Sequence, residues 1–280
     1  MAHPQIAIFA RLAEENAKPT RLLAGQATRL ARTMHDIRYD AVHDEIIVPN
    51  PFAQAILVFR GGADGEEAPI RIIQGPHTLL QGTGAAAGGV DRLDVDPVHD
   101  EIFVPAGEKI LVYPRTGNGD VPPLRIIEGP DTTLYRAQAI AVDPVHNVIV
   151  AGTHRSYNNG QGALLIFNRT DNGNVKPQRI IMGPKAEIGN MNQILIYPPK
   201  GWIVAAQTGN SYGVLEPEGV YIGVWSIYDD GDVPARWKLA GDRSVIKKPR
   251  GIALDPKNKE LIVADMRLNA VLTFYFPEIF

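Results

Sequence analysis

The sequence predicts an all-β protein, a five-bladed β-propeller built of four-stranded antiparallel blades. Three observations lead to this prediction: a motif that returns at intervals of about 50 residues, turn-forming residues between short apolar runs, and no convincing helical stretch. Four strands in a repeat of about 50 residues are typical of propeller blades. We therefore expect residues 1–280 to form a single propeller domain.

The outer two strands of each blade, C and D, are predicted from the repeated motif. A proline is followed two positions later by an arginine and then, after three or four mostly apolar residues, by a glycine. An aromatic residue closes an apolar run nine or ten positions before the proline, and turn formers lie between. Two short strands around such a turn form a β-hairpin. The hairpins end near residues 25, 75, 129, 183 and 241, and their D-strand arginines are Arg21, Arg71, Arg125, Arg179 and Arg236. The regular spacing of these arginines predicts a structural role, such as bonding a neighbouring strand or blade.

The inner two strands, A and B, are predicted from a second repeated unit between the hairpins. Residues 93–96 run through a short turn into residues 101–104, and the other four copies follow the same pattern. Asp-Pro at 96–97 and its counterparts suits a tight turn between two strands. Histidines recur in these turns at 43, 99 and 146, and we interpret them as solvated turn residues of separate blades.

The two ends of the chain are predicted to share the closing blade. Residues 6–25 supply a C–D hairpin, and residues 249–280 supply A, B and a further C strand at 271–276. This gives 21 strands, one more than five four-stranded blades require. The surplus strand either becomes a fifth strand of the closing blade or pairs with another subunit, because an exposed strand edge is a template for pairing. Residues 11–18 have helical propensity, but their alignment with four hairpin loops favours a loop.

Composition excludes several classes of protein. The absence of cysteine rules out a disulfide scaffold, a thiolate zinc site and a cysteine nucleophile. A net charge of −3 gives no electrostatic footprint for nucleic acid, and the apolar runs are too short to cross a bilayer. The N-terminus shows no secretory signal, so a cytoplasmic protein and a processed exported form both remain open.

Residues 255–265, Asp-Pro-Lys-Asn-Lys-Glu-Leu-Ile-Val-Ala-Asp, resemble the strand-turn-strand signature of NHL-repeat propellers. The resemblance extends over nearly the whole chain and reaches the senescence-marker-protein/gluconolactonase-like propellers. Such hydrolases hold a divalent cation near the channel with carboxylate and amide oxygens. The Asp-Pro-Val-His-Asp-Glu turns, the Pro-x-Arg hairpins and the five blades, where those enzymes have six, depart from that pattern.

One polar residue stands at the same place in each A strand, two positions before a recurring aliphatic residue. These residues are His35, Asp91, Gln138, Asn192 and Arg250. Because A strands line the central channel, we expect the five side chains to converge on one mouth as a ligand site. Arg250 suits a carboxylate or phosphate. The resemblance implies Asp91 and Asn192 as ligands of a cation such as calcium, with His35 as a candidate general base. The alternative is that a wet mouth simply tolerates polar residues.

Two long B–C connections on adjacent blades could also carry recognition, at residues 154–160 with Tyr157 and at residues 208–218 with Tyr212. The function predicted from these features is a binding or scaffold module for a small polar ligand or a protein partner. The alternatives are a metal-assisted hydrolase of lactonase or esterase type and a structural protein that assembles through its surplus strand. The sequence does not decide whether the protein is an enzyme.

Overall fold

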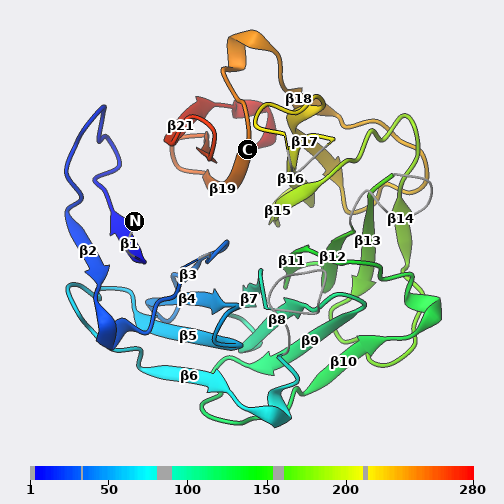
Figure 1. The fold of residues 1–280 in the computed structure, drawn as a ribbon. Helices are drawn as coiled ribbons and strands as arrows, with labels where there is room; N and C mark the ends of the chain where they lie inside the picture. The colour runs from blue at the N-terminus through cyan, green and yellow to red at the C-terminus, as the bar shows by residue number, and fades with distance from the viewer. Residues whose placement is uncertain (1–3, 33, 81–89, 154–160, 211–213) are drawn as a thin grey trace.

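The computed structural model is an all-β, five-bladed β-propeller, and it describes residues 4–32, 34–80, 90–153, 161–210 and 214–280 (Figure 1). The predicted fold class is therefore confirmed. Four blades are complete antiparallel sheets in which four consecutive strands run from the channel to the rim. In the described part of the chain, no helix is long and apolar enough to cross a membrane.

Each complete blade contains the four strands that the two repeated sequence units predict. The first is β3 (Arg38–Asp40), β4 (Glu45–Asn50), β5 (Ala55–Arg60) and β6 (Arg71–Gln74). The second is β7 (Asp94–Asp96), β8 (Glu101–Pro105), β9 (Lys109–Pro114) and β10 (Arg125–Glu128). The third is β11 (Ala139–Asp143), β12 (Val148–Thr153), β13 (Ala163–Asn168) and β14 (Arg179–Ile181). The fourth is β15 (Met191–Tyr197), β16 (Trp202–Thr208), β17 (Val220–Ser226) and β18 (Trp237–Leu239).

The middle strands are apolar because both of their faces are covered by adjacent blades. In β5, Ile56, Leu57, Val58 and Phe59 are at most 1% exposed. Burying one such side chain contributes roughly 1.5–3 kcal/mol. The core is accordingly a series of apolar clusters between neighbouring blades.

A side-chain clamp joins the C–D loop of each complete blade to the D strand of the blade before it. Asn118 accepts a hydrogen bond from Ile72 N at 3.0 Å, and Asp120 accepts one from His77 N at 2.7 Å, at the start of the 3-10 helix η2 (Pro76–Thr78). Gly119, at φ 78°, lies between them and exchanges two backbone bonds with β6. The same clamp recurs at residues 64–66, 172–174 and 230–232.

Buried ion pairs form a second link between blades. Glu45, at the start of β4, accepts Arg71 from its own blade and Arg115 from the next, both at 2.7 Å. Glu101 repeats the arrangement with Arg125 and Arg169, both at 2.6 Å. These contacts give the D-strand arginines of the first two blades the structural role expected from their spacing.

The A–B turns are held by their aspartates. Asp96 accepts hydrogen bonds from the backbone N of Val98 and His99 and from His99 Nδ1, the last at 2.7 Å. The turns that contain His43 and His146 are built in the same way. The recurrent histidines therefore lie in turns of separate blades, as we expected.

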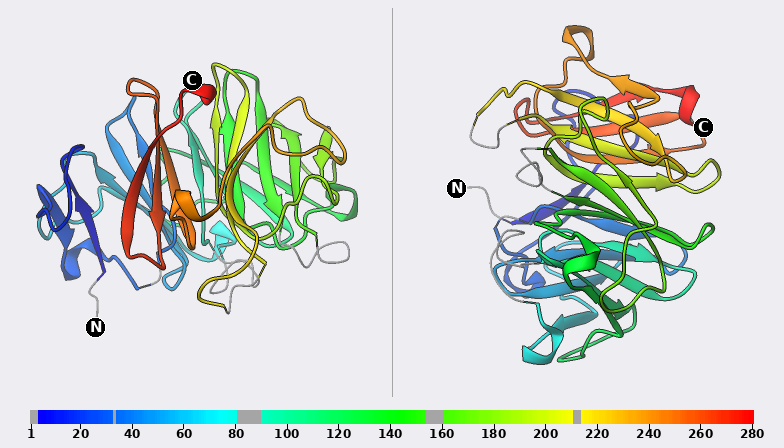
Figure 2. Two further views of the ribbon diagram at one scale, coloured as in Figure 1. Left: turned by 90° about the horizontal axis from the view of Figure 1, so that it is seen from above. Right: turned by 90° about the vertical axis from the view of Figure 1, so that its right-hand side faces the viewer.

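The closing blade draws on both termini, but its strands form two separate sheets. The C-terminal sheet contains β19 (Pro249–Asp255), β20 (Glu260–Asp265) and β21 (Ala270–Tyr275), and the N-terminal hairpin contains β1 (Gln5–Ile8) and β2 (Arg21–Ala24). All 21 predicted strands are present. The surplus strand does not become a fifth strand of the closing blade, because among the described residues β21 pairs only with β20 and β1 only with β2. Pairing of that strand with another subunit stays a prediction. Residues 11–18 form turns, as predicted, and Arg11 Nη1 reaches Glu260 Oε2 at 2.9 Å. Figure 2 shows the hairpin and the C-terminal sheet as distinct layers.

Candidate functional site

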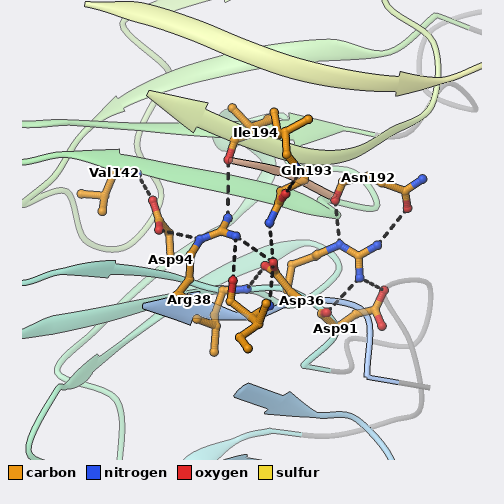
Figure 3. Close-up of polar contacts among 12 residues, drawn as sticks. Asp36, Arg38, Asp91, Asp94, Val142, Asn192, Gln193 and Ile194 are labelled. Atoms are coloured by element: carbon orange, nitrogen blue, oxygen red, sulfur yellow. Dashed lines mark hydrogen bonds and ion pairs between the residues drawn. The ribbon is translucent and has the colours of Figure 1, made fainter. Parts of the chain in front are cut away.

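The channel is lined by the A strands and crossed by a network of buried polar side chains (Figure 3). Asp36, Arg38, Asp91, Arg92, Asn192 and Gln193 are each at most 9% exposed. Buried polar groups are costly unless they are hydrogen-bonded. Each of these side chains therefore needs hydrogen-bond partners within the channel.

Arg92 connects the second and fourth blades near the mouth. Its Nε donates to the carbonyl oxygen of Asn192 at 2.6 Å, and its Nη2 donates to Asn192 Oδ1 at 2.8 Å. Its Nη1 donates to the carbonyl oxygen of Asp91 at 3.0 Å and faces Asp91 Oδ2 at 3.2 Å. The guanidinium thus holds two of the predicted residues, Asp91 and Asn192, in fixed positions.

Arg38 makes the matching connection further along the channel. It donates to Asp36 Oδ1 at 2.7 Å and to Asp94 Oδ1 at 2.8 Å. Asp36 in turn accepts Gln193 Nε2 at 2.6 Å, and Gln193 Oε1 accepts the backbone N of Ile252. Four blades are linked by these few side chains, because their A strands converge on one axis.

Four of the five predicted mouth residues belong to one connected group. His35 Nδ1 lies 2.5 Å from Asp91 Oδ1, and Arg250 Nη1 donates to Asn192 Oδ1 at 3.0 Å. Gln138 lies in the fifth equivalent position, half-buried, with its backbone N bonded to the carbonyl of Gly152. The remaining predicted residues, Tyr157 and Tyr212, lie outside the described residues.

The sequence interpretation missed the arginines that organise the site. Arg92 and Arg38 were not singled out, and neither were Asp36 and Gln193. One signal was available: Asp36 lies two positions before Arg38, the first residue of β3, and in extended chain this spacing places both side chains on the same face. Charged residues that share the channel face of an A strand must find partners there.

The basic groups at the mouth favour the ionised form of Asp91. Burial of Asp91 opposes ionisation, but the hydrogen bond from His35 and the positive charges of Arg92 and Arg250 outweigh it and keep the pKa of Asp91 below its ordinary value. Burial lowers the pKa of Lys248, and the charge of nearby Arg250 lowers it further. Arg92 and Arg250 therefore act on the Asp91 carboxylate, and Lys248 adds a third basic group near Arg250.

The cation site implied by the resemblance does not fit these residues. Asn192 Oδ1 accepts hydrogen bonds from Arg92 and Arg250, and the two oxygens of Asp91 face His35 and Arg92. The described residues contain no cluster of three or more histidine or acidic side chains suited to a metal ion. Hard cations require oxygen ligands that are free to face them, so Asp91 and Asn192 are unsuited to hold calcium in this arrangement.

Asn192 leaves one donor unused. Its side chain is fully buried, and among the described residues its Nδ2 has no hydrogen-bond partner. The orientation of the amide follows from its neighbours, because Oδ1 accepts from two arginines. An unsatisfied buried donor of this kind costs roughly 1–3 kcal/mol.

The chain matches none of the known protein-family models, and no curated protein is significantly similar to it. The resemblance of residues 255–265 to NHL repeats therefore stays a prediction.

Proposed function

We propose that this propeller is a binding module whose ligand is a small polar molecule with a carboxylate or phosphate group, bound at the channel mouth. The observation that carries the proposal is the buried Nδ2 of Asn192, which has no partner among the described residues and belongs to an amide whose Oδ1 accepts from Arg92 and Arg250. A ligand oxygen placed there would satisfy the donor and face two positive charges.

The charge balance of the mouth supports an anionic ligand. Arg92, Arg250 and Lys248 outnumber Asp91, and Asp265 is directed to backbone N–H groups, including those of Lys247 and Lys248 at 2.8 Å. A cationic ligand would meet repulsion at this place, whereas an anion would be attracted.

The mouth is also preorganised for binding. The side chain of His35 is 43% exposed, so it can meet a ligand, while Asp91 below it is buried and fixes the imidazole. Groups held by rigid strands lose little conformational freedom on binding, which favours affinity.

Isothermal titration with inorganic phosphate, succinate and citrate at low ionic strength tests this proposal, with uncharged glucose as the negative probe. We expect saturable binding of at least one anion, weakened about 10-fold or more by Arg250→Gln. Arg243→Gln, at an exposed position on the 3-10 helix η5 (Asp242–Ser244), is the matched control and should bind as the parent does. Equal affinity in both variants, or no binding of any anion, would refute the proposal.

A second candidate function, hydrolysis, is favoured by the short contact between His35 and Asp91. A carboxylate that holds a histidine by Nδ1 leaves Nε2 to act as a general base toward water. Turnover of p-nitrophenyl acetate and of a simple lactone would test it, and His35→Gln should abolish that turnover. His77→Gln is the control, because His77 forms a similar pair with Asp120 at the exposed rim.

A further inference from the structure

Three apolar residues near the two terminal sheets are exposed, although the residues at equivalent positions in the other blades are buried. Val271 of β21 is 66% exposed, whereas the residues at the same position in the other four blades are 0% exposed: Ile56, Ile110, Leu164 and Ile222. Ile37, before β3, is 44% exposed against at most 6% for its four counterparts, and Phe9, after β1, is 49% exposed against 0%. Each of these positions is covered by a strand of a neighbouring blade elsewhere in the ring. We call the region between β21, β1 and Ile37 the open sector.

The strands that border the open sector have unpaired edges. In the complete blades a C strand pairs with a B strand on one side and a D strand on the other. Within the described residues β21 lacks a D strand, and β1 lacks the B and A strands that would lie inside it. Figure 1 shows the hairpin β1–β2 and the sheet β19–β21 on either side of this sector.

The loop of the N-terminal hairpin has the same backbone conformation at its centre as the four clamp loops, but among the described residues it contacts no D strand. By alignment, Glu14, Glu15 and Asn16 stand where Asn118, Gly119 and Asp120 clamp β6. Glu15 has φ 50°, in the left-handed region that glycine occupies in the other four loops. That conformation is unfavourable for a non-glycine residue, so the loop keeps the clamp geometry at a cost. All of residues 11–18 are exposed, and among the described residues none of their hydrogen bonds reaches a D strand.

Glu260 binds one arginine fewer than the equivalent glutamates of the first two blades, Glu45 and Glu101. Glu45 and Glu101 each bind two arginines, one from the D strand of their own blade and one from the next blade. Glu260 binds Arg11, which corresponds to the arginine of the next blade. The carboxylate therefore offers a place for an arginine on a D strand beside β21.

We infer that the open sector binds a polypeptide segment of a partner protein that folds there as three strands in the order D, A, B. Its D strand would pair with β21, place the arginine of a Pro-x-Arg motif on Glu260 and be held by residues 14–16. Its B strand would pair with the free edge of β1, its A strand would pair with that B strand, and the two strands together would cover Ile37 and Val271. One continuous segment fits, because in this chain each D strand is followed directly by the A and B strands of the next blade. The inference does not depend on the ligand site at the channel mouth.

The chain itself supplies the probe, a peptide with the sequence of residues 121–153, which contains one D–A–B unit (β10, β11 and β12). The fluorescein-labelled peptide would be titrated into the full chain and followed by fluorescence anisotropy. We expect saturable one-to-one binding and, in hydrogen exchange, new protection of β1 and β21. A peptide with Ile127→Asp should bind at least about 100-fold more weakly, because Ile127 is fully buried in its own blade.

Host variants separate specific insertion from non-specific apolar binding. Glu260→Gln should weaken the peptide about 10-fold by removing the acceptor for its arginine. Glu128→Gln, at an exposed pair with Lys109, should leave binding unchanged. If the peptide is poorly soluble, the same segment can be joined by a flexible linker before residue 4, and a raised Tm with protected β1 and β21 is then expected.

Three outcomes would overturn the inference. The first is no binding of the peptide and no rise in Tm of the linked chain. The second is equal binding of the parent and Ile127→Asp peptides. The third is a concentration-dependent dimer of the chain alone in which β1 and β21 are already protected, which would make a second copy the occupant.

Discussion

Buried arginines decide the character of the channel at the scale of single residues. Arg92 is 1% exposed and donates to a carbonyl, an amide oxygen and a carboxylate in two blades. The pKa of Arg38 is raised because Asp36 and Asp94 more than offset its burial, so this guanidinium stays charged inside the protein. Such groups favour one arrangement of the blades, because a shifted blade would leave a charge unpaired.

Arg92→Ala should lower the free energy of unfolding by about 3–5 kcal/mol. The loss follows from leaving the buried Asn192 carbonyl and Asp91 Oδ2 without the guanidinium, while His35 still contacts Asp91 Oδ1 and Arg250 still donates to Asn192 Oδ1. Urea denaturation followed by circular dichroism measures it. The exposed Arg243→Ala provides the comparison and should change stability by less than about 0.5 kcal/mol. A loss of similar size in both variants would contradict the role given to Arg92.

Asp91 should make the fold sensitive to acid. Its pKa is lower in the folded protein than in the unfolded chain, so the unfolded chain binds the proton more readily and stability rises with pH between the two values. The stabilisation should be complete above about pH 5 and decline as the pH falls below about 4, through the lowered pKa. Comparing the parent with Asp91→Asn from pH 3 to pH 7 tests this, and a stability difference that stays constant over the whole range would refute it.

At the scale of elements, the C–D loops of the four complete blades link each blade to the one before it. Each clamp has three positions, with a glycine of positive φ in the middle and a polar side chain on either side. The first position is Asn or Asp, and the third is Asp, Asn or Glu, because both side chains must accept a backbone hydrogen bond. Local helix propensity at residues 11–18 is overridden by the same loop shape. The hairpin turn was therefore predictable from alignment of the repeats, although not from the propensity of that segment alone.

Asn118→Ala should destabilise the protein by about 1 kcal/mol, because Ile72 N loses its acceptor at the edge of β6. Thermal unfolding would report the loss as a lower Tm. Glu14→Ala is the matched variant in the fifth loop, which holds no D strand among the described residues, and should leave Tm unchanged. Equal decreases in Tm for the two variants would contradict the stabilising role given to the hydrogen bond between Ile72 N and Asn118.

At the scale of the whole molecule, the ring is stabilised unevenly. Blades two to four are covered on both faces, whereas blade one exposes Ile37. Among the described residues, the terminal strands β1 and β21 each have an unpaired edge and exposed apolar residues in or beside them. Regions with few buried contacts open with the smallest free energies. The two termini are thus the least stable part of the fold.

Hydrogen exchange should show this difference directly. Peptides covering β1 and β21 should exchange at least about 10-fold faster than those covering the C strands β5, β9 and β13, because unpaired edges leave amides open to water. Mass spectrometry of the chain alone, at low concentration, gives the rates. Comparable protection of all C strands would show that the open sector is closed in solution.

The repeats determined the fold by themselves. The spacing of Arg71, Arg125 and Arg179, the aromatic residue before each proline and the Asp-Pro turns were enough to predict the strands and the number of blades. Such features are local, since a hairpin and its turn lie within about 20 residues of chain. Alignment of the repeats also predicted that His35, Asp91, Asn192 and Arg250 lie at equivalent depths, and the structure connects these four side chains through Arg92, while their role as a ligand site stays a prediction.

Only the tertiary structure decided which residues meet across the axis and how the ring ends. Arg92 and Asn192 are 100 positions apart, and no repeat pattern states which blades face each other. The split of the closing blade was equally hidden, because β1 and β21 both have the sequence of a C strand and local pattern cannot choose between them. Pairing of such strands depends on the edges that the rest of the ring leaves available, and that is a property of the assembled fold.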